Sequence, residues 1–165
     1  MAGMPVLDAL GREPESPASR ALRDRTLVAL YVGDRYGIGP ELVAALLSER
    51  AATAHCRLLV VGDPAVFARG QRSAGVALSL PEVASPADAA ACAKPVVFLP
   101  RPFAAELLPL GRVTEPSGRE ILATLHAMAE AARDGHLQGL VYAPLNKQAM
   151  KLAGHATGDE FDVLA

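Results

Sequence analysis

Short runs of apolar, often β-branched residues recur along the chain, and segments with helical spacing separate them. A continuous apolar run of this length is typical of a strand that is buried on both faces of a sheet. The runs predict strands over residues 26–32, 57–61, 76–80, 96–99 and 140–142.

Proline, capping residues and glycine predict where the intervening helices begin and end. Pro40 precedes an apolar segment, and a proline at the first helical position loses no helical hydrogen bond. Ser85 and Asn146 are well placed to cap helices, and Gly154 is well placed to end the second of them. The predicted helices cover 18–25, 41–49, 64–74, the turn that starts at 86, and 147–153.

The segment 118–134 gives the clearest helix, because the spacing of its apolar residues places them on one face. Ser117 is predicted to be the N-cap, and Glu120, three residues later, is predicted to complete a capping box. Gly135 follows the last helical residue, as is typical of a helix end.

Strands that alternate with helices indicate an α/β fold with a mostly parallel sheet flanked by helices. In such sheets ligands bind in the crevice beyond the carboxyl ends of the strands, and the loops 33–40 and 143–147 lie at such ends. Residues 1–25, rich in Pro, Ser, Arg and Glu, are predicted to form a flexible N-terminal extension, and residues 26–165 the α/β part. The proline-rich segment 100–116 is predicted to be an irregular connection.

Composition excludes several classes of protein. Of the 165 residues 51% are apolar and the net charge is −2, which argues against a disordered chain. The balanced charge and the 4% of aromatic residues argue against a nucleic-acid partner, and no apolar run approaches the roughly 20 residues of a membrane span. Cys56 and Cys92 are too few for a disulfide framework and indicate small core residues in a reducing compartment. We therefore expect a cytoplasmic protein.

The loop 33–41, GDRYGIGPE, is the first candidate for chemistry because it links a strand to a helix. It departs from the dinucleotide-binding fingerprint, since Leu42 stands where the third glycine belongs. Its glycines would let a ligand approach the backbone, and Asp34 and Glu41 would supply charge. A tight turn without a ligand explains the same residues.

Two further segments place charged groups at the ends of predicted elements. Lys147 follows a buried strand, where a lysine can neutralise a phosphate or carboxylate or act in proton transfer. A solvated lysine at a helix start is the alternative. The segment 115–120 joins a helix N-terminus to Arg119, an arrangement that either binds an anion or simply caps the helix.

His155, Asp159, Glu160 and Asp162 form a cluster near the end of the sequence. Histidine and carboxylate side chains at this spacing are candidate ligands of a divalent metal. A solvated acidic cluster without a metal is the alternative.

Two of these segments resemble motifs of one known family. Residues 33–42, GDRYGIGPEL, resemble the GDPAGIGPE segment of the 4-hydroxythreonine-4-phosphate dehydrogenase family of vitamin B6 (pyridoxine) biosynthesis. Residues 143–154, APLNKQAMKLAG, resemble the same family's (A/G)P-x-(N/H)-K…AG segment, and the separation of the two motifs also agrees. The resemblance covers the chain from about 26 to 165.

The resemblance implies an isocitrate-dehydrogenase-like α/β fold that works as a homodimer. Such enzymes oxidise a secondary alcohol with NAD or NADP and a divalent metal (Mg, Mn, Zn or Co), and the 3-keto acid then loses CO₂. The metal would polarise the developing carbonyl. The implied substrate is 4-phosphohydroxy-L-threonine or a related four-carbon hydroxy-acid phosphate, such as threonate or erythronate 4-phosphate. Other relatives act on aromatic cis-dihydrodiol dicarboxylates.

The family's functional residues carry over unevenly. Lys147 stands where the family has its lysine, which implies a catalytic residue that positions substrate or assists proton transfer. Arg119 and Glu120 fall where many members place substrate-contacting residues, one of them often a histidine. Asn146 and Asp34 lie within the two motifs and complete the predicted substrate-binding set.

The predicted metal position departs from the family pattern. Many members read GHTEF, whereas residues 158–161 read GDEF and lack the histidine. Either Asp159 replaces it as an oxygen ligand, which would favour Mg²⁺ or Mn²⁺, or His155 takes its place. No segment resembles a cofactor fingerprint, so no cofactor-binding residue is predicted.

Two hypotheses follow from the resemblance. Family members are much longer, and the remaining metal ligands and the dinucleotide site lie in the half that this sequence lacks. The chain is therefore either the N-terminal part of a divergent dehydrogenase, or a truncated non-catalytic paralogue that binds a phosphorylated or carboxylated ligand or pairs with a full-length subunit. Arg35 and Tyr36, which replace the family's Pro-Ala, favour divergence. We also expect exposed apolar surface where the second half would pack.

Overall fold

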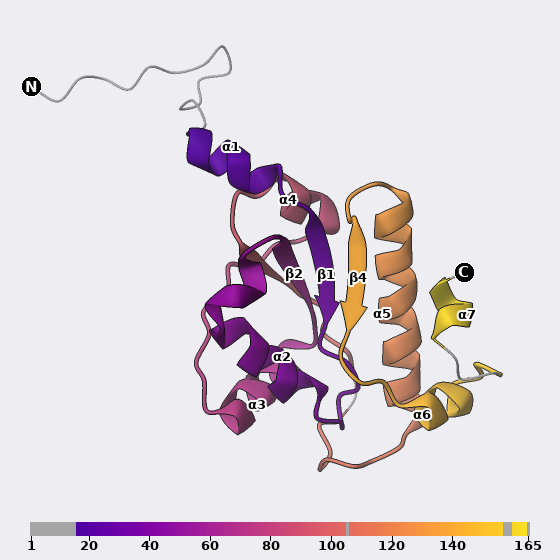
Figure 1. Cartoon of the computed structure of the whole chain (residues 1–165). Helices are drawn as coiled ribbons and strands as arrows, with labels where there is room; N and C mark the ends of the chain where they lie inside the picture. Colours follow the sequence, from indigo (N-terminus) through magenta and orange to yellow (C-terminus); the bar gives the residue numbers. More distant parts are fainter. Residues whose placement is uncertain (1–15, 105, 157–159, 165) are drawn as a thin grey trace, which may run out of the picture.

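A parallel four-stranded sheet forms the centre of the fold in the computed structural model, which describes residues 16–104, 106–156 and 160–164 (Figure 1). The strands are β1 (Leu27–Tyr31), β2 (Arg57–Gly62), β3 (Val96–Pro100) and β4 (Gly139–Tyr142). They lie side by side in the order β3-β2-β1-β4. The strand order therefore reverses between β1 and β4, and such a switch point opens a crevice at the carboxyl ends of the strands.

Helices lie on both sides of this sheet. They are α1 (Pro17–Arg23), α2 (Gly39–Ser48), α3 (Pro64–Ala74), α4 (Pro86–Ala91), α5 (Glu115–Arg133), α6 (Lys147–Leu152) and α7 (Phe161–Leu164), with a short 3₁₀ helix, η1 (Arg50–Thr53), after α2. The helices α2 and α3 pack together on one face, and α5 lies on the other with α6 and α7 beside it (Figure 1). The sheet is thus sandwiched, as its continuous apolar strands require.

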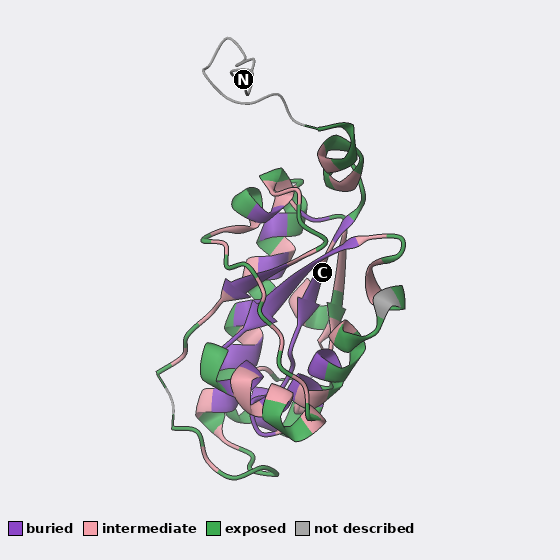
Figure 2. Cartoon of the chain, turned by 90° about the vertical axis from the view of Figure 1, so that its left-hand side faces the viewer, coloured by how far each residue is buried: buried purple, intermediate pink, exposed green. Residues whose placement is uncertain are grey.

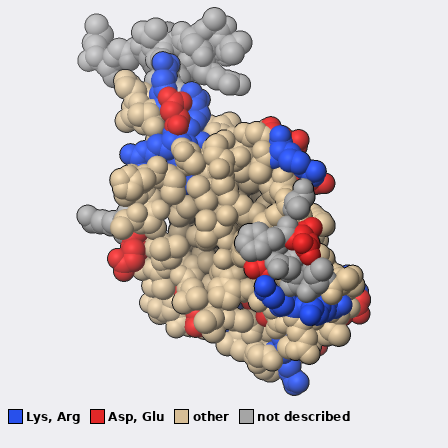
Figure 3. All heavy atoms as spheres, turned by 45° about the vertical axis from the view of Figure 1, so that its right-hand side comes forward, with Lys and Arg blue, Asp and Glu red and all other residues tan. Residues whose placement is uncertain are grey.

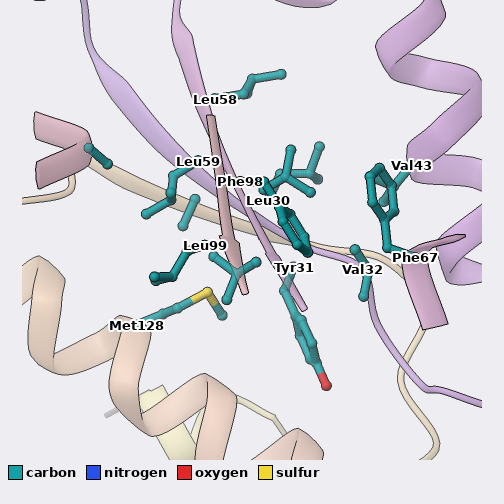
Figure 4. Close-up of a cluster of buried hydrophobic side chains, with 14 of the residues drawn as sticks. Leu30, Tyr31, Val32, Val43, Leu58, Leu59, Phe67, Phe98, Leu99 and Met128 are labelled. Carbon is teal, nitrogen blue, oxygen red and sulfur yellow. The ribbon is translucent and has the colours of Figure 1, made fainter. Parts of the chain in front are cut away.

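The core lies between the sheet and these two layers of helices. All six residues of β2 are buried, whereas α1 has no buried residue (Figure 2). On the α2–α3 side the rings of Phe67 and Phe98 stack with their centroids 5.4 Å apart. On the α5 side Met128 lies beside Leu59 and Leu99 (Figure 4). Successive side chains of a strand point to opposite faces of the sheet, so the strands contribute to the core on both sides.

The sequence analysis located four of these strands, but the predicted strand over 76–80 is wrong. Those residues form no strand, and near them only Glu82 makes an isolated bridge to Phe98. The backbone N–H of Leu78 donates instead to the side chain of Gln71, 2.7 Å away. A side chain of α3 thus takes the place of a neighbouring strand.

The predicted capping box of α5 is also wrong. The helix begins at Glu115, three residues earlier than expected, and Thr114 is its N-cap. The Thr114 hydroxyl accepts a hydrogen bond from the Ser117 N–H at 3.2 Å. Pro116 occupies the first turn, where its missing N–H leaves no bond unmade. Glu120 consequently takes no part in capping and is buried in the interior.

Two of the short helices, α1 and α6, agree with the sequence analysis. Asn146 caps α6, and its side chain accepts a hydrogen bond from the Ala149 N–H at 3.0 Å. In the predicted N-terminal extension the described residues 17–23 form α1, close to the helix expected there. Cys56 and Cys92 are free thiols, half-buried against the core. None of the described helices has the length and apolarity needed to cross a bilayer.

Part of the surface is apolar, in agreement with the exposed apolar surface that the sequence analysis expects. Ile38, Leu42 and Leu46 form a stripe on α2 in which each side chain is between 45% and 53% exposed. Val141 on the edge strand β4 is 52% exposed. A broad area without charged residues is visible in Figure 3. Large exposed apolar areas are typical of surfaces that another polypeptide covers.

A close backbone contact between α5 and α6 yields a test of the fold. A Cβ added at Gly118 would overlap the backbone carbonyl of Ala149. We expect Gly118→Ala to lower the free energy of unfolding by about 2 kcal/mol, because one of the two helices must move. Urea unfolding measures the change. Gly37→Ala is the control, since its Cβ would meet neighbours only at 3.5 Å; equal stability of the two variants would contradict the packing.

Candidate functional site

The two family-like loops meet in the crevice between β1 and β4. The backbone N–H of Asp34 donates to the Pro144 carbonyl at 3.2 Å. Gly33 has a φ of 85°, and a Cβ there would lie 2.8 Å from the same carbonyl oxygen. At Gly39 a Cβ would lie 2.9 Å from the Cβ of Ala143. Glycine is therefore required in the first loop so that the second can pack against it.

Asp34 and Asn146 are the predicted site residues that the fold brings into contact. Asp34 is 4% exposed, and its carboxylate accepts a hydrogen bond from the Tyr36 N–H at 3.2 Å. The side chain of Asn146 lies near this carboxylate. Burial raises the pKa of Asp34, while the hydrogen bond from Tyr36, the polar side chain of Asn146 and the nearby cations Arg35 and Arg69 oppose the rise. The carboxylate and the amide thus lie together at the start of α6.

A buried ion cluster lies directly behind Asp34. The guanidinium of Arg35 has its Nη2 3.0 Å from an Asp63 carboxylate oxygen and its Nε 2.6 Å from a Glu120 carboxylate oxygen. The three side chains, which we call the Arg35 centre, are between 1% and 9% exposed. The other Asp63 oxygen caps α3 by accepting from Ala65 and Val66. The Arg35 centre thus ties the β1 loop to α3 and α5.

Burial changes the acidity of the groups around this centre. It raises the pKa of Glu120 to about 7, because loss of water outweighs the attraction of Arg35, and the charges of Asp63 and Asp34 add to the rise. The Tyr31 hydroxyl, fully buried near Glu120, also has a raised pKa, mainly because of its burial. Negative charge is therefore costly on this side of the crevice.

The sequence analysis did not identify Arg35 and Asp63 as site residues. The available signal was a charged residue in a glycine turn, at the position where the family has proline. That signal does not indicate which residues pair with Arg35, because Asp63 and Glu120 stand 28 and 85 positions away in the sequence. Only the parallel arrangement of strands brings positions 35, 63 and 120 together.

Lys147 and Arg119 lie nearer the surface than the Arg35 centre. The Lys147 side chain is 58% exposed, and its Nζ lies 3.3 Å from a carboxylate oxygen of Glu160. Arg119 pairs with Glu115 on the exposed side of α5. It also lines a hollow of about 450 Å³ with Tyr36, Phe103, Glu106, Leu108 and Thr114. Arg119 and Glu120, adjacent in sequence, thus face different surroundings.

The predicted metal ligands are only partly described. Asp159 lies outside the described residues. His155 is half-buried just after α6, and its backbone N–H donates to the Met150 carbonyl at 3.1 Å. Within the described ranges no three His, Cys, Asp or Glu side chains come together as a possible metal site. The described residues alone therefore do not form a complete metal site.

Comparison with known proteins agrees with the two motifs. The family model of the pyridoxal phosphate biosynthetic protein PdxA matches residues 54–165. The chain belongs to the PdxA family. This match begins after the first motif, while alignments with individual relatives extend over more of the chain.

Several relatives of this PdxA-family chain are named dehydrogenases. A 4-hydroxythreonine-4-phosphate dehydrogenase of Trichlorobacter lovleyi is 32% identical over 84% of this chain and 42% of its own length. A D-threonate 4-phosphate dehydrogenase of Bordetella bronchiseptica is 34% identical over 84% of this chain and 40% of its own. The chain thus spans about two-fifths of the length of the curated relatives it matches.

Solved structures share the fold. The 4-hydroxythreonine-4-phosphate dehydrogenase of Klebsiella pneumoniae superposes with a TM-score of 0.73 at 27% identity, covering 86% of this chain and 43% of that one. That of Burkholderia phymatum gives a TM-score of 0.76 at 24% identity with the same coverage and supports the fold alone. The parallel sheet flanked by helices is therefore the family's architecture for this part of the chain.

The raised pKa of Glu120 predicts a pH dependence of stability. Its pKa of about 7 exceeds the ordinary value of 4.5, so its contribution is complete below pH 4.5 and is lost as the pH rises to about 7. Relative to Glu120→Gln, the native chain should therefore lose up to about 3 kcal/mol of unfolding free energy across this range. Urea unfolding at several pH values measures it.

The matched control for this pH dependence is Glu115→Gln, which removes the exposed carboxylate of the same helix. This variant should follow the pH profile of the native chain. A Glu120→Gln profile that also follows the native one would contradict the assignment.

Proposed function

We propose that this chain provides part of the substrate site of an NAD(P)-dependent, metal-assisted dehydrogenase. The substrate is a small phosphorylated hydroxy acid, 4-phosphohydroxy-L-threonine or a related four-carbon acid such as D-threonate 4-phosphate. The names of the relatives support this substrate class. The homodimer implied by the resemblance belongs to the same proposal.

The contact of the two family-like loops in one crevice carries this proposal. Asp34 and Pro144 come from motifs more than one hundred residues apart, yet the Asp34 N–H donates to the Pro144 carbonyl at the switch point of the sheet. Crevices at such switch points are where α/β proteins bind small ligands. The first loop also opens the ten-residue helix α2, and the second opens α6.

The chain's own residues bind and orient the substrate. Lys147, with its exposed side chain, neutralises a phosphate or carboxylate oxygen by exchanging its pairing with Glu160 for the ligand. Asn146 is held by its bond from the Ala149 N–H and offers its amide beside Asp34. Arg119 provides a second cation at the neighbouring hollow. Glu120 acts behind them through Arg35.

The metal and the cofactor require more than the described residues. When bound, NAD(P) accepts a hydride and a divalent metal polarises the new carbonyl. His155 is the one predicted ligand within the described residues, and those residues hold no group of three suitable side chains. The described residues therefore do not fit a metal by themselves, and their own part in the reaction is to bind and orient the substrate.

A second candidate function is a non-catalytic ligand-binding protein, or one that pairs with a full-length subunit. The exposed apolar residues Ile38, Leu42 and Val141 favour the pairing, because another polypeptide could cover them. A catalytic chain reduces NAD⁺ or NADP⁺ in the presence of the phosphorylated acid and Mg²⁺ or Mn²⁺. A binding protein takes up the acid without turnover.

Lys147 gives the sharpest test of the proposed site. We expect Lys147→Ala to raise the Kd for D-threonate 4-phosphate about 10- to 100-fold, because one charge-assisted hydrogen bond to the anion is lost. Isothermal titration calorimetry measures this binding, and unphosphorylated D-threonate shows how much the phosphate contributes.

Lys151→Ala is the control for this test, since Lys151 is an exposed lysine of the same helix. It should bind the acid as the native chain does. Unchanged affinity in Lys147→Ala would remove this lysine from the site. A native chain that binds neither D-threonate 4-phosphate nor 4-phosphohydroxy-L-threonine would overturn the substrate class.

A further inference from the structure

The segment 101–113, which we call the arm, connects β3 to α5, and its described residues form no helix or strand. None of its described residues is buried, and its apolar Leu107, Leu110 and Val113 are between 39% and 52% exposed. The arm therefore gains little from apolar packing, and another interaction must hold it against the domain.

Polar contacts to the first loop and to its neighbours supply this anchorage. The Tyr36 hydroxyl donates to the Glu106 carbonyl at 2.6 Å, and the Tyr36 carbonyl accepts from the Gly111 N–H at 2.8 Å. Arg69 donates to the Leu108 carbonyl at 3.1 Å and also to the carbonyl of Arg35. These hydrogen bonds hold the arm at Glu106, Leu108 and Gly111.

The Arg35 centre lies next to the start of the arm, at Phe103. The Asp63 oxygen that receives Arg35 also accepts from the Phe103 N–H at 3.1 Å. The guanidinium carbon of Arg35 lies 5.8 Å from the centre of the Phe103 ring and 5.9 Å from that of Tyr36, in cation–π geometry. One planar cation thus orients the carboxylate that holds the base of the arm and the ring that holds its middle.

The arm in turn forms one wall of each of two hollows beside α5. Tyr36, Phe103 and Leu108 face Thr114 and Arg119 across the larger hollow. The smaller hollow, of about 210 Å³, lies between the arm's base, at Arg101 and Phe103, and Glu120 on α5. The position of the arm therefore decides the shape of the space around Arg119.

We propose that Arg35 is a positioning residue that holds the arm against α5 and so shapes the hollow in which Arg119 meets an anionic ligand. The ligand half of this inference rests on the proposed function, whereas the placement of the arm does not. Arg35 stands where the family motif has proline, so this positioning interaction is a feature of this chain and not of the motif.

The positioning role requires a planar guanidinium that presents several N–H donors in fixed directions. Arginine presents its Nε–H to Glu120 and its Nη2–H to Asp63 from one rigid plane. A lysine retains the positive charge but offers a single ammonium, so it cannot hold both carboxylates at these angles. Arg35→Lys therefore separates charge compensation, which keeps the domain folded, from orientation of the arm.

Amide hydrogen exchange of the purified chain, followed by mass spectrometry, tests the position of the arm. We expect Arg35→Lys to speed exchange in peptides from 103–111 by at least about 10-fold while β1, β2 and β3 keep their protection. Tyr36→Phe, which removes the hydroxyl that donates to the Glu106 carbonyl, should speed it by about 5-fold. Arg133→Lys, the same exchange at an exposed arginine of α5, is the matched control and should leave the arm unchanged.

Titration with D-threonate 4-phosphate then tests the ligand half. Arg35→Lys should raise the Kd about 10-fold although Lys147 is intact. Native protection of the arm in both Arg35→Lys and Tyr36→Phe would overturn the positioning role. Faster exchange of the arm in Arg35→Lys together with an unchanged Kd would show that the position of the arm does not affect the ligand. If the native chain binds no phosphorylated hydroxy acid, the proposed function fails, and the exchange data still decide whether Arg35 positions the arm.

Discussion

The rest of the site depends on the compensation of one buried charge. An arginine that is 2% exposed must keep its partners, because an unpaired ion in the interior costs several kcal/mol. Arg35 meets this requirement with Asp63 from the end of β2 and Glu120 from α5. The ion cluster therefore fixes how three segments approach one another. Burial of this cluster also explains why Glu120, though paired with Arg35, has a pKa raised to about 7.

A second constraint is the close approach of two backbones at the switch point. Gly33 and Gly39 leave no room for side chains where the 143–144 backbone crosses the first loop. This contact places Asp34 next to Asn146 and opens α6 in the right direction. The two family-like motifs thus have a structural explanation, because the glycines of the first pack against the backbone of the second. The match to the PdxA family model covers the second segment of this contact, whereas the first loop precedes the matched residues.

Periodicity and capping located most of the elements because both are local properties. The apolar runs of β1, β2, β3 and β4 and the Asn146 cap needed no tertiary information. The failures arose where distant groups competed with local ones. Gln71 satisfied the backbone at Leu78, so an apolar alternation became a coil packed on the core. Thr114 took the cap predicted for Ser117, which left Glu120 available to Arg35.

The sequence by itself determined the α/β class, the order of the elements and the two loops that carry the family resemblance, since each depends on residues within one turn or one strand. It also named Asp34 and Asn146 for the site. Only the tertiary structure decided that Asp34 lies against the Arg35 centre, that Lys147 pairs with Glu160, and that Arg119 faces away from Glu120. The physical reason is that charge pairing and burial depend on which segments the parallel sheet brings together. No local pattern encodes that a guanidinium at 35 will meet carboxylates at 63 and 120.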